Sequence, residues 1–211
     1  MNLRNAYWYF TSQLGDNFCD EVIQLGNSKQ EKIGVTGGAS DRVKKRKPGV
    51  NPNSVEKLLN KKELKSLKKQ RDSNVVWLND QWIYDELCPL IAMANQNAGW
   101  NFQYDYFEAI QFTKYKLNQH YTWHKDSQFA KDKNEPIRKI SSVIFLNNPK
   151  DYKGGEFQFK LDNERKQNII KLKPEVGTVI VFPSFITHRV TPVTSGVRHT
   201  LVSWTKGPQF K

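Results

Sequence analysis

Two histidines and an aspartate stand at positions where they could share one metal ion. His124 and Asp126 are separated by one residue in the run Tyr-Thr-Trp-His-Lys-Asp, and His188 follows far downstream. In an extended strand, side chains at positions i and i+2 point the same way, so one imidazole and one carboxylate could bind the same ion. A second imidazole from a distant strand would complete a two-histidine, one-carboxylate triad. Such a triad leaves coordination positions open and is typical of non-haem Fe(II) oxygenases.

The other residues that could do chemistry are few. An H-x-D pair alone is a weak motif, because many such pairs are ordinary loop or surface residues. The chain has four histidines, and His120 lies outside the i, i+2 relation with Asp126, so we do not expect it to be a ligand. His199 should point to the opposite face of its strand from Arg198, as a structural or exposed residue. Arg198 could hold a dicarboxylate with its forked guanidinium.

Around these residues, a series of motifs runs in order through residues 111–208. The motifs are Tyr115 and Tyr121 leading into His124-Lys125-Asp126, residues 140–147, Tyr152-Lys-Gly-Gly-Glu-Phe157, residues 173–183, and residues 188–198 followed by Trp204. In this order they resemble the prolyl 4-hydroxylase-like branch of the Fe(II)/2-oxoglutarate dioxygenases, including its bacterial and phage members.

This resemblance implies a set of site residues and cofactors. His124, Asp126 and His188 would bind Fe(II), Arg198 would bind the distal carboxylate of 2-oxoglutarate, and Tyr115 would help to hold this co-substrate. O2 would be the oxidant and ascorbate the reductant. The implied reaction is hydroxylation of an unactivated C–H bond, above all in a peptidyl proline, with release of succinate and CO2.

Four further positions bear on the substrate and the co-substrate. Tyr121 and Trp123 flank the first ligand and are our candidates for lining the substrate entrance, with core packing as the alternative. Asn118 stands where relatives often have Gly, and Phe145 stands where many have Tyr. The missing phenol could have hydrogen-bonded the co-substrate, so either 2-oxoglutarate binds more loosely or Tyr115 supplies the contact.

The elements that must position these residues are mainly short β-strands. Segments rich in Val, Ile, Phe and Thr, with Gly, Pro, Asn and Asp between them, predict strands at 111–115, 140–146, 156–161, 168–172, 178–182 and 199–204. We therefore expect a mainly β fold with flanking α-helices, whose core is the double-stranded β-helix (jelly roll). At 211 residues the chain suits a single domain, 1–211.

The first half of the chain, 1–100, is expected to give this core (101–211) helical support. Apolar spacing predicts amphipathic helices at 14–25 and 80–95 that cover one face of the β-core, and a short strand at Trp77 and Leu78. Between the two helices, residues 42–71 carry 12 Lys and Arg against two acids, which gives +10 of the net charge of +12. Here we expect a loop at 44–49 and a solvated helix at 54–70.

The composition of the basic segment does not identify what the segment binds. It could dock an acidic partner or act as a lid, it could suit nucleic acid, or it could be a solvated insertion without a ligand. Cys19 and Cys88 give no disulfide framework, and no apolar run approaches the roughly 20 residues that span a bilayer. We therefore expect a soluble cytoplasmic protein that does not use a membrane.

Three classes of function agree with these patterns. The first is a 2-oxoglutarate-dependent hydroxylase with a protein or peptide substrate, and the second is a related oxygenase that acts on nucleic acid or a small molecule. Nucleic-acid demethylases of this type resemble one another in a second Arg six residues after the co-substrate Arg, and Trp204 stands there in this chain. The third is a non-catalytic metal-binding module, which would not need Arg198.

Overall fold

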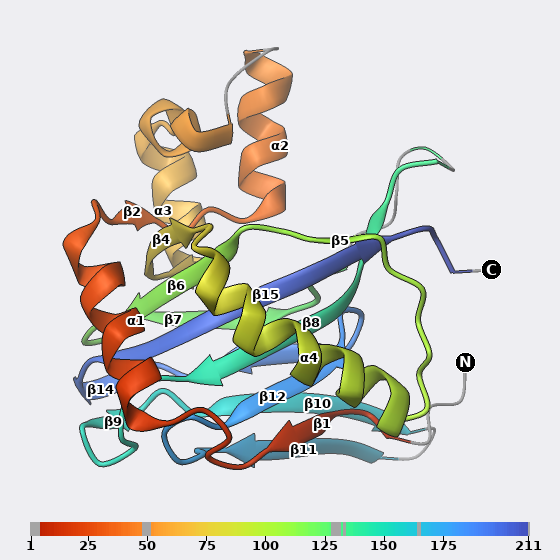
Figure 1. Cartoon of the computed structure of the whole chain (residues 1–211). Coiled ribbons are helices and arrows are strands. Elements are labelled where there is room, and N and C mark those ends of the chain that lie inside the picture. The colour runs from red at the N-terminus through yellow and green to blue at the C-terminus, as the bar shows by residue number, and fades with distance from the viewer. Residues whose placement is uncertain (1–4, 48–51, 128–131, 133, 164–165, 211) are drawn as a thin grey trace.

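Two facing antiparallel sheets form the centre of the molecule (Figure 1). The computed structural model describes residues 5–47, 52–127, 132, 134–163 and 166–210. The larger sheet has the order β1-β12-β8-β15-β6-β4-β2, with β5 also paired to β15, and the smaller sheet has the order β11-β10-β13-β7-β3. This arrangement confirms the predicted jelly roll with flanking helices.

The strand bounds are as follows. The larger sheet contains β1 (Trp8–Phe10), β2 (Lys32–Ile33), β4 (Asn74–Leu78), β5 (Tyr106–Phe107), β6 (Ile110–Tyr115), β8 (Ile137–Phe145), β12 (Val179–Pro183) and β15 (Arg198–Gly207). The smaller sheet contains β3 (Arg71–Asp72), β7 (His120–His124), β10 (Phe157–Asn163), β11 (Lys166–Leu172) and β13 (Thr187–Val190). A separate ribbon pairs β9 (Tyr152–Gly154) with β14 (Val193–Gly196).

The larger sheet is buried on both faces, and strand alternation explains how. In β12, Val179 and Val181 belong to the core under the helices, whereas Ile180 and Phe182 belong to the core between the sheets. Successive side chains on a strand point to opposite faces, so a continuous apolar run is required where both faces are covered. All six predicted strands are present, each within a few residues of its predicted bounds.

Two amphipathic helices, α1 (Asp16–Ser28) and α4 (Gln81–Asn97), cover the outer face of the larger sheet, as predicted (Figure 1). Four residues at helical spacing in α4 are buried: Ile83, Leu87, Ile91 and Ala94. In α1, a Cβ added at Gly26 would lie 2.3 Å from the Phe112 ring, so glycine lets this helix approach β6 closely. No helix among the described residues is long and apolar enough to cross a bilayer.

The first half of the chain is less purely helical than expected. Four strands, β1 to β4, come from it and extend both sheets. The expectation of a short strand at Trp77 and Leu78 is confirmed by β4, which is longer and lies between β6 and β2. The helical support and the β-core are therefore interleaved.

The helical insertion, which we define as α2 (Gly37–Arg46), η1 (Pro52–Leu58) and α3 (Lys61–Gln70) between β2 and β3, corrects two predictions. The predicted loop at 44–49 was wrong for its first half: Thr36 caps α2 by accepting a hydrogen bond from the Ala39 N–H, and buried Ala39 and Val43 hold the helix down. Pro48 and Gly49 lie outside the described residues.

The single helix predicted at 54–70 is divided in two. Asn60 and Glu63 form a capping box, in which the Asn60 side chain accepts from the Glu63 N–H and the Glu63 carboxylate accepts from the Asn60 N–H. A capping box starts a helix, so α3 begins at Lys61 and the preceding residues form a separate 3-10 turn.

Candidate active site

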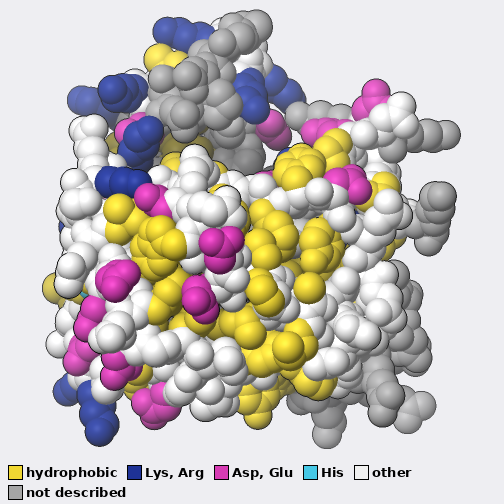
Figure 2. Space-filling view, viewed as in Figure 1, with side chains coloured by type: hydrophobic (Ala, Val, Ile, Leu, Met, Phe, Trp, Pro, Cys, Tyr) yellow, Lys and Arg dark blue, Asp and Glu magenta, His cyan; other side chains and the backbone are white. Residues whose placement is uncertain are grey.

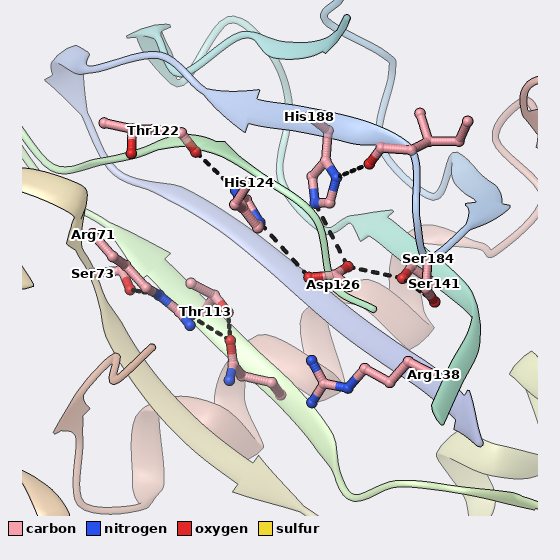
Figure 3. A network of polar contacts seen from close by, with 12 residues as sticks. Arg71, Ser73, Thr113, Thr122, His124, Asp126, Arg138, Ser141, Ser184 and His188 are labelled. Carbon is pink, nitrogen blue, oxygen red and sulfur yellow. Dashed lines mark hydrogen bonds and ion pairs between the residues drawn. The ribbon is translucent and has the colours of Figure 1, made fainter. Parts of the chain in front are cut away.

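The three predicted metal ligands lie together where β7 and β13 pair. His124 and His188 are directly opposite each other in this pair, and Asp126 follows β7 by two residues. Figure 3 shows both imidazoles pointing at the Asp126 carboxylate. His124 Nε2 lies 3.7 Å from Asp126 Oδ1, and His188 Nε2 lies 3.6 Å from Asp126 Oδ2. One donor atom from each residue falls within 4.8 Å of the others, so the three could hold one ion.

Backbone carbonyls fix which nitrogen of each imidazole faces this centre. The Nδ1 atom of His124 lies 2.8 Å from the Thr122 carbonyl oxygen, and that of His188 lies 2.9 Å from the Ile186 carbonyl oxygen. A carbonyl can only accept a hydrogen bond, so both Nδ1 atoms carry the proton. Both Nε2 atoms then present a lone pair to a metal, which is the usual way that outer hydrogen bonds orient ligating histidines.

The Asp126 carboxylate is held from its other side. Ser141 Oγ donates to Asp126 Oδ2 over 2.8 Å and lies 2.8 Å from Ser184 Oγ, while the Asp126 N–H donates to the Ser184 carbonyl. Burial alone would raise the pKa of Asp126, but the facing histidines, His188 and His124, outweigh it and hold the pKa below its usual range. Burial, then the charge of His188, lowers the pKa of His124 to about 3. At neutral pH the carboxylate is therefore ionised and the His124 imidazole neutral, as metal binding requires.

A cavity of about 670 Å³ connects this cluster with Arg198. Its wall includes the three candidate ligands together with Tyr115, Tyr121 and Arg198. Tyr115 lies directly opposite Arg198 in the pairing of β6 with β15, so strand register places the predicted co-substrate residues side by side. Register also keeps His199 out of the cavity, because it points to the other face of β15 and stacks on Phe112.

Arg198 is buried and its hydrogen-bonding capacity is incompletely used. Its side chain is 1% exposed, and Nη1 makes a long contact of 3.5 Å to Thr200 Oγ1. Among the described residues, its Nε and Nη2 atoms have no hydrogen-bond partner. A buried guanidinium with unused donors is costly unless an acceptor completes it. A carboxylate is the natural partner for this fork, so the residues present fit 2-oxoglutarate.

One residue beside Arg198, Tyr152, was not given a role at the site by the sequence analysis. Burial raises the pKa of the Tyr152 phenol, and the nearby charge of Arg198 opposes this rise. Phe145 occupies the position where relatives often have Tyr, and the Arg198 Cζ atom lies 5.0 Å from its ring centroid. A Cβ added at Gly155, where φ is +61°, would meet Arg198 Cδ at 2.9 Å, so the turn glycine makes room for the guanidinium.

The two aromatic candidates for the substrate entrance have different positions. The pairing of β7 with β13 shifts register between His188 and Val190, which is a β-bulge that directs both Tyr121 and His124 into the cavity. The Tyr121 ring stacks on the His124 ring at a centroid distance of 3.4 Å. Trp123 is not part of the cavity wall and lies against Arg189 instead, 4.3 Å from the guanidinium carbon. The proposed lining role of Trp123 therefore loses its geometric basis.

Other charged residues also belong to the cavity wall, among them Arg71, Arg138 and Lys206. Arg138 and Lys206 both contact Glu108, with closest distances of 2.5 Å and 3.4 Å, and the Arg138 guanidinium lies 3.9 Å from the Trp204 ring centroid. Arg71 is buried in the opposite wall and donates to Ser73 and Gln111 (Figure 3). Lone charged residues carry no motif, so no sequence signal would have singled them out.

His120, the competing ligand, lies outside the metal cluster. Its Nδ1 and Nε2 atoms lie 3.2 and 3.3 Å from the backbone carbonyl oxygens of Asn118 and Lys69. It is not a member of the cluster that could hold a metal among the described residues.

Curated relatives match a little under half of the chain. A PKHD-type hydroxylase of Synechococcus sp. (strain JA-3-3Ab) is 35% identical over 97 residues, which are 46% of this chain and 42% of the relative. A second PKHD-type hydroxylase, from Psychrobacter sp. (strain PRwf-1), is 40% identical over 96 residues, which are 44% of this chain and 36% of the relative. The matches thus span about two fifths of the length of these relatives.

Solved structures share the fold over nearly the whole chain. A viral collagen prolyl hydroxylase from Paramecium Bursaria Chlorella virus-1 has a TM-score of 0.64 at 20% identity and covers 97% of both chains. A prolyl-4-hydroxylase of Pseudomonas putida has a TM-score of 0.63 at 18% identity and covers 98% of this chain and 95% of its own. A prolyl hydroxylase from Trichoplax adhaerens, solved with a peptide fragment of hypoxia inducible factor, has a TM-score of 0.66 at 19% identity and covers 96% of this chain and 84% of its own.

The family model of the 2OG-Fe(II) oxygenase superfamily matches residues 110–206, a range that runs from β6 to β15 and contains every candidate ligand as well as Arg198. This family uses Fe(II), 2-oxoglutarate and O2, in agreement with the predicted cofactors. Residues 110–206, a little under half of the chain, are therefore similar to the 2OG-Fe(II) oxygenase superfamily, and this similarity includes every candidate metal ligand and Arg198.

Proposed function

We propose that this protein is an Fe(II)- and 2-oxoglutarate-dependent dioxygenase that hydroxylates a proline in a peptide or protein substrate. The observation that carries the proposal is one cavity that holds both the His124, Asp126 and His188 cluster and the buried, incompletely bonded Arg198. A non-catalytic metal-binding module would not need the second feature. Iron with 2-oxoglutarate supplies, when bound, oxygen activation coupled to decarboxylation, which leaves succinate and CO2.

Different residues of the chain bind the metal, bind the co-substrate and orient the ligands. The two Nε2 atoms and the Asp126 carboxylate would hold the ion, as a triad of this kind does in non-haem Fe(II) oxygenases. Arg198 fixes the distal carboxylate of 2-oxoglutarate from the inner end, with Tyr115 and Tyr152 beside it. Ser141 and the carbonyls of Thr122 and Ile186 hold the ligands in one orientation, which limits loss of geometry during turnover.

The cavity wall supports a peptide with a small ring as substrate. Tyr121, Trp204 and Trp77 supply aromatic surface on which a proline ring can pack, and Glu108 and Arg138 supply a hydrogen-bonding pair for a peptide backbone. The structural neighbours with the same fold include prolyl hydroxylases, one of them solved with a peptide. The peptidyl proline is the substrate that these features favour together.

The test is to find which substrate gains oxygen. Purified protein with Fe(II), ascorbate and 2-oxoglutarate should be offered proline-containing peptides, free amino acids and single-stranded DNA, with omission of 2-oxoglutarate as the control. We expect a mass gain of one oxygen on a peptide proline, with one succinate formed for each hydroxylation. Oxygen added to a free amino acid or to DNA would contradict the peptide substrate. If no succinate forms with any of these substrates, and none forms when 2-oxoglutarate is supplied without a substrate, the proposed dioxygenase activity is contradicted.

A further inference from the structure

The helical insertion concentrates positive charge next to the cavity. Residues 42–71 contain 12 Lys and Arg against Glu56 and Glu63, and all of these cations except Arg71 have exposed side chains. Glu63 accepts from Arg46, and Glu56 accepts from the Ile33 N–H, so both acids already hold the insertion together. Figure 2 shows most of the Lys and Arg side chains visible in this view at the top of the molecule, with a smaller basic group at the lower left. The excess charge of the insertion therefore faces solvent.

One face of α2 links the cavity to this charge. The cavity wall includes Gly37, Ser40, Asp41 and Lys44, which recur every three or four residues and so lie on one side of the helix. Beyond Lys44, the same helix ends in the exposed Lys45, Arg46 and Lys47. A chain that leaves the cavity along α2 would therefore meet the basic end of the insertion.

The other end of the insertion is joined to the strand that carries His124. The Gln70 carbonyl at the end of α3 accepts from Thr122 Oγ1, and the Lys69 carbonyl lies 3.3 Å from His120 Nε2. The next residue, Arg71, stands in the cavity wall. The insertion is thus held in a fixed position relative to the candidate metal site, as a docking surface that sets distance along a substrate would need.

We propose that the basic end of the helical insertion docks an acidic segment of the protein substrate at a fixed distance from the hydroxylated residue. This inference rests on the proposed function, since it concerns the same cavity. Ten residues of α2 rise about 15 Å, and an extended peptide covers roughly 3.3 Å per residue, so the acidic segment lies at least about five residues from the target. Charge complementarity of this kind acts mainly on substrate capture and on specificity.

The charge distribution favours an acidic peptide over nucleic acid. The cavity wall contains both signs of charge, with the carboxylates of Asp41, Glu56, Glu108 and Glu135 placed among Lys and Arg side chains. A nucleic acid carries a negative charge at every nucleotide and would bring phosphates against these carboxylates. A peptide can keep its acidic residues outside, on the insertion, and enter the cavity with a neutral segment.

The test compares three lysines at the cavity-bordering elements with three elsewhere. Lys45, Lys47 and Lys57 are exposed at the end of α2 and in η1, and would be changed together to Gln. The matched control changes Lys150, Lys153 and Lys171, which are exposed on the opposite half of the chain. The probes are fluorescent peptides with one proline and, about five to ten residues away, either a run of Glu or the same run as Gln. Binding anisotropy and hydroxylation are both measured in the full chain.

We expect the acidic peptide to bind wild-type protein more tightly than its neutral twin, with an advantage that falls as salt rises. The triple Lys45, Lys47, Lys57 variant should lose roughly 3- to 150-fold of this affinity, because exposed charge contacts contribute about 0.2–1 kcal/mol each. The control variant should bind the acidic peptide as tightly as the wild-type protein does.

Equal binding of the acidic and the neutral peptide would overturn the docking surface, whether or not either peptide is hydroxylated. If a single-stranded oligonucleotide binds more tightly than the acidic peptide, and the triple lysine variant loses this binding, nucleic acid rather than an acidic peptide occupies the surface. Binding as expected without hydroxylation would contradict the proposed function and leave the docking surface standing.

Discussion

The metal-binding end of the jelly roll and the helical insertion beside it are held in place by different kinds of contact. His124, His188 and Arg198 sit on strands whose partners are distant in the chain, and their positions depend on cross-strand register. The insertion is stabilised by two local caps, at Thr36 and Asn60, and by a few hydrogen bonds to neighbouring strands, with few buried apolar residues. Geometry set by register over two large sheets is rigid, whereas short capped helices with a thin apolar side open more readily. The two regions should therefore be separable by mutation.

The largest expected effect is the loss of the metal in His188→Ala. Removing one of three protein ligands takes away a donor that nothing nearby replaces, and weaker perturbations of metal sites already cost about 10- to 100-fold in affinity. We expect stoichiometric Fe(II) binding and succinate formation to fall to background. His120→Ala, a histidine outside the cluster, is the control and should retain both. Full succinate formation by His188→Ala would remove this residue from the ligand set.

The second effect is a weaker hold on 2-oxoglutarate in Arg198→Ala. Losing a charged, bidentate contact costs on the order of 1.5–3 kcal/mol, which is roughly 10- to 100-fold in the KM for 2-oxoglutarate. Iron binding should survive, because Arg198 is not in the ligand cluster.

Lys206→Ala is the control for this anchor. Lys206 lies eight residues further along β15 and contacts Glu108, so 2-oxoglutarate affinity should change little. A KM that is unchanged in Arg198→Ala and raised in Lys206→Ala would move the anchor to the lysine.

Sequence reasoning succeeded where chemistry concentrates in a motif. The jelly roll, the six main strands and the meeting of His124, Asp126 and His188 followed from strand alternation and from the resemblance. The positions of Tyr152 and Trp123 did not follow. Tyr152 reaches Arg198 only through the fold. Trp123 alternates with the ligand His124 and so points away from the cavity, whereas the β-bulge between β7 and β13 turns Tyr121 toward it.

The insertion shows the opposite difficulty. Its high charge predicted a solvated segment, and the run of Lys and Arg at 44–47 predicted a loop. The buried side chains of Ala39 and Val43 nevertheless pack α2 as a helix. Helical spacing across Asn60 suggested one helix, although the side chains of Asn60 and Glu63 specify a start at this point. Where a capping box interrupts an apolar repeat, the cap can determine the start of the helix, as it does for α3.

A third prediction sharpens the contrast in stability. Leu67 is 1% exposed and is the buried residue of α3, so Leu67→Ala should destabilise the insertion by about 2 kcal/mol, at the low end for a buried leucine. Hydrogen exchange should accelerate in α3 while β7 and β13 stay protected. Leu117→Ala, at a leucine that is 61% exposed, is the matched control and should change neither. Equal loss of protection in the two strands would show that the insertion and the site unfold as one unit.

The smallest effect concerns the phenol that stands beside the co-substrate anchor. Phe145 lacks the hydroxyl that relatives often place near Arg198, and Tyr152, from β9, brings a phenol to the same guanidinium. If Tyr152 holds Arg198 in position for the carboxylate, then Tyr152→Phe removes one hydrogen bond, worth about 1 kcal/mol, and raises the KM for 2-oxoglutarate roughly fivefold. Iron affinity and the KM for the substrate peptide should not move, since the ring remains in the core. Tyr104→Phe, in the core under the helices, is the control. A KM for 2-oxoglutarate that is the same in both variants would leave Tyr115 as the phenol that serves the co-substrate, and would confine Tyr152 to packing.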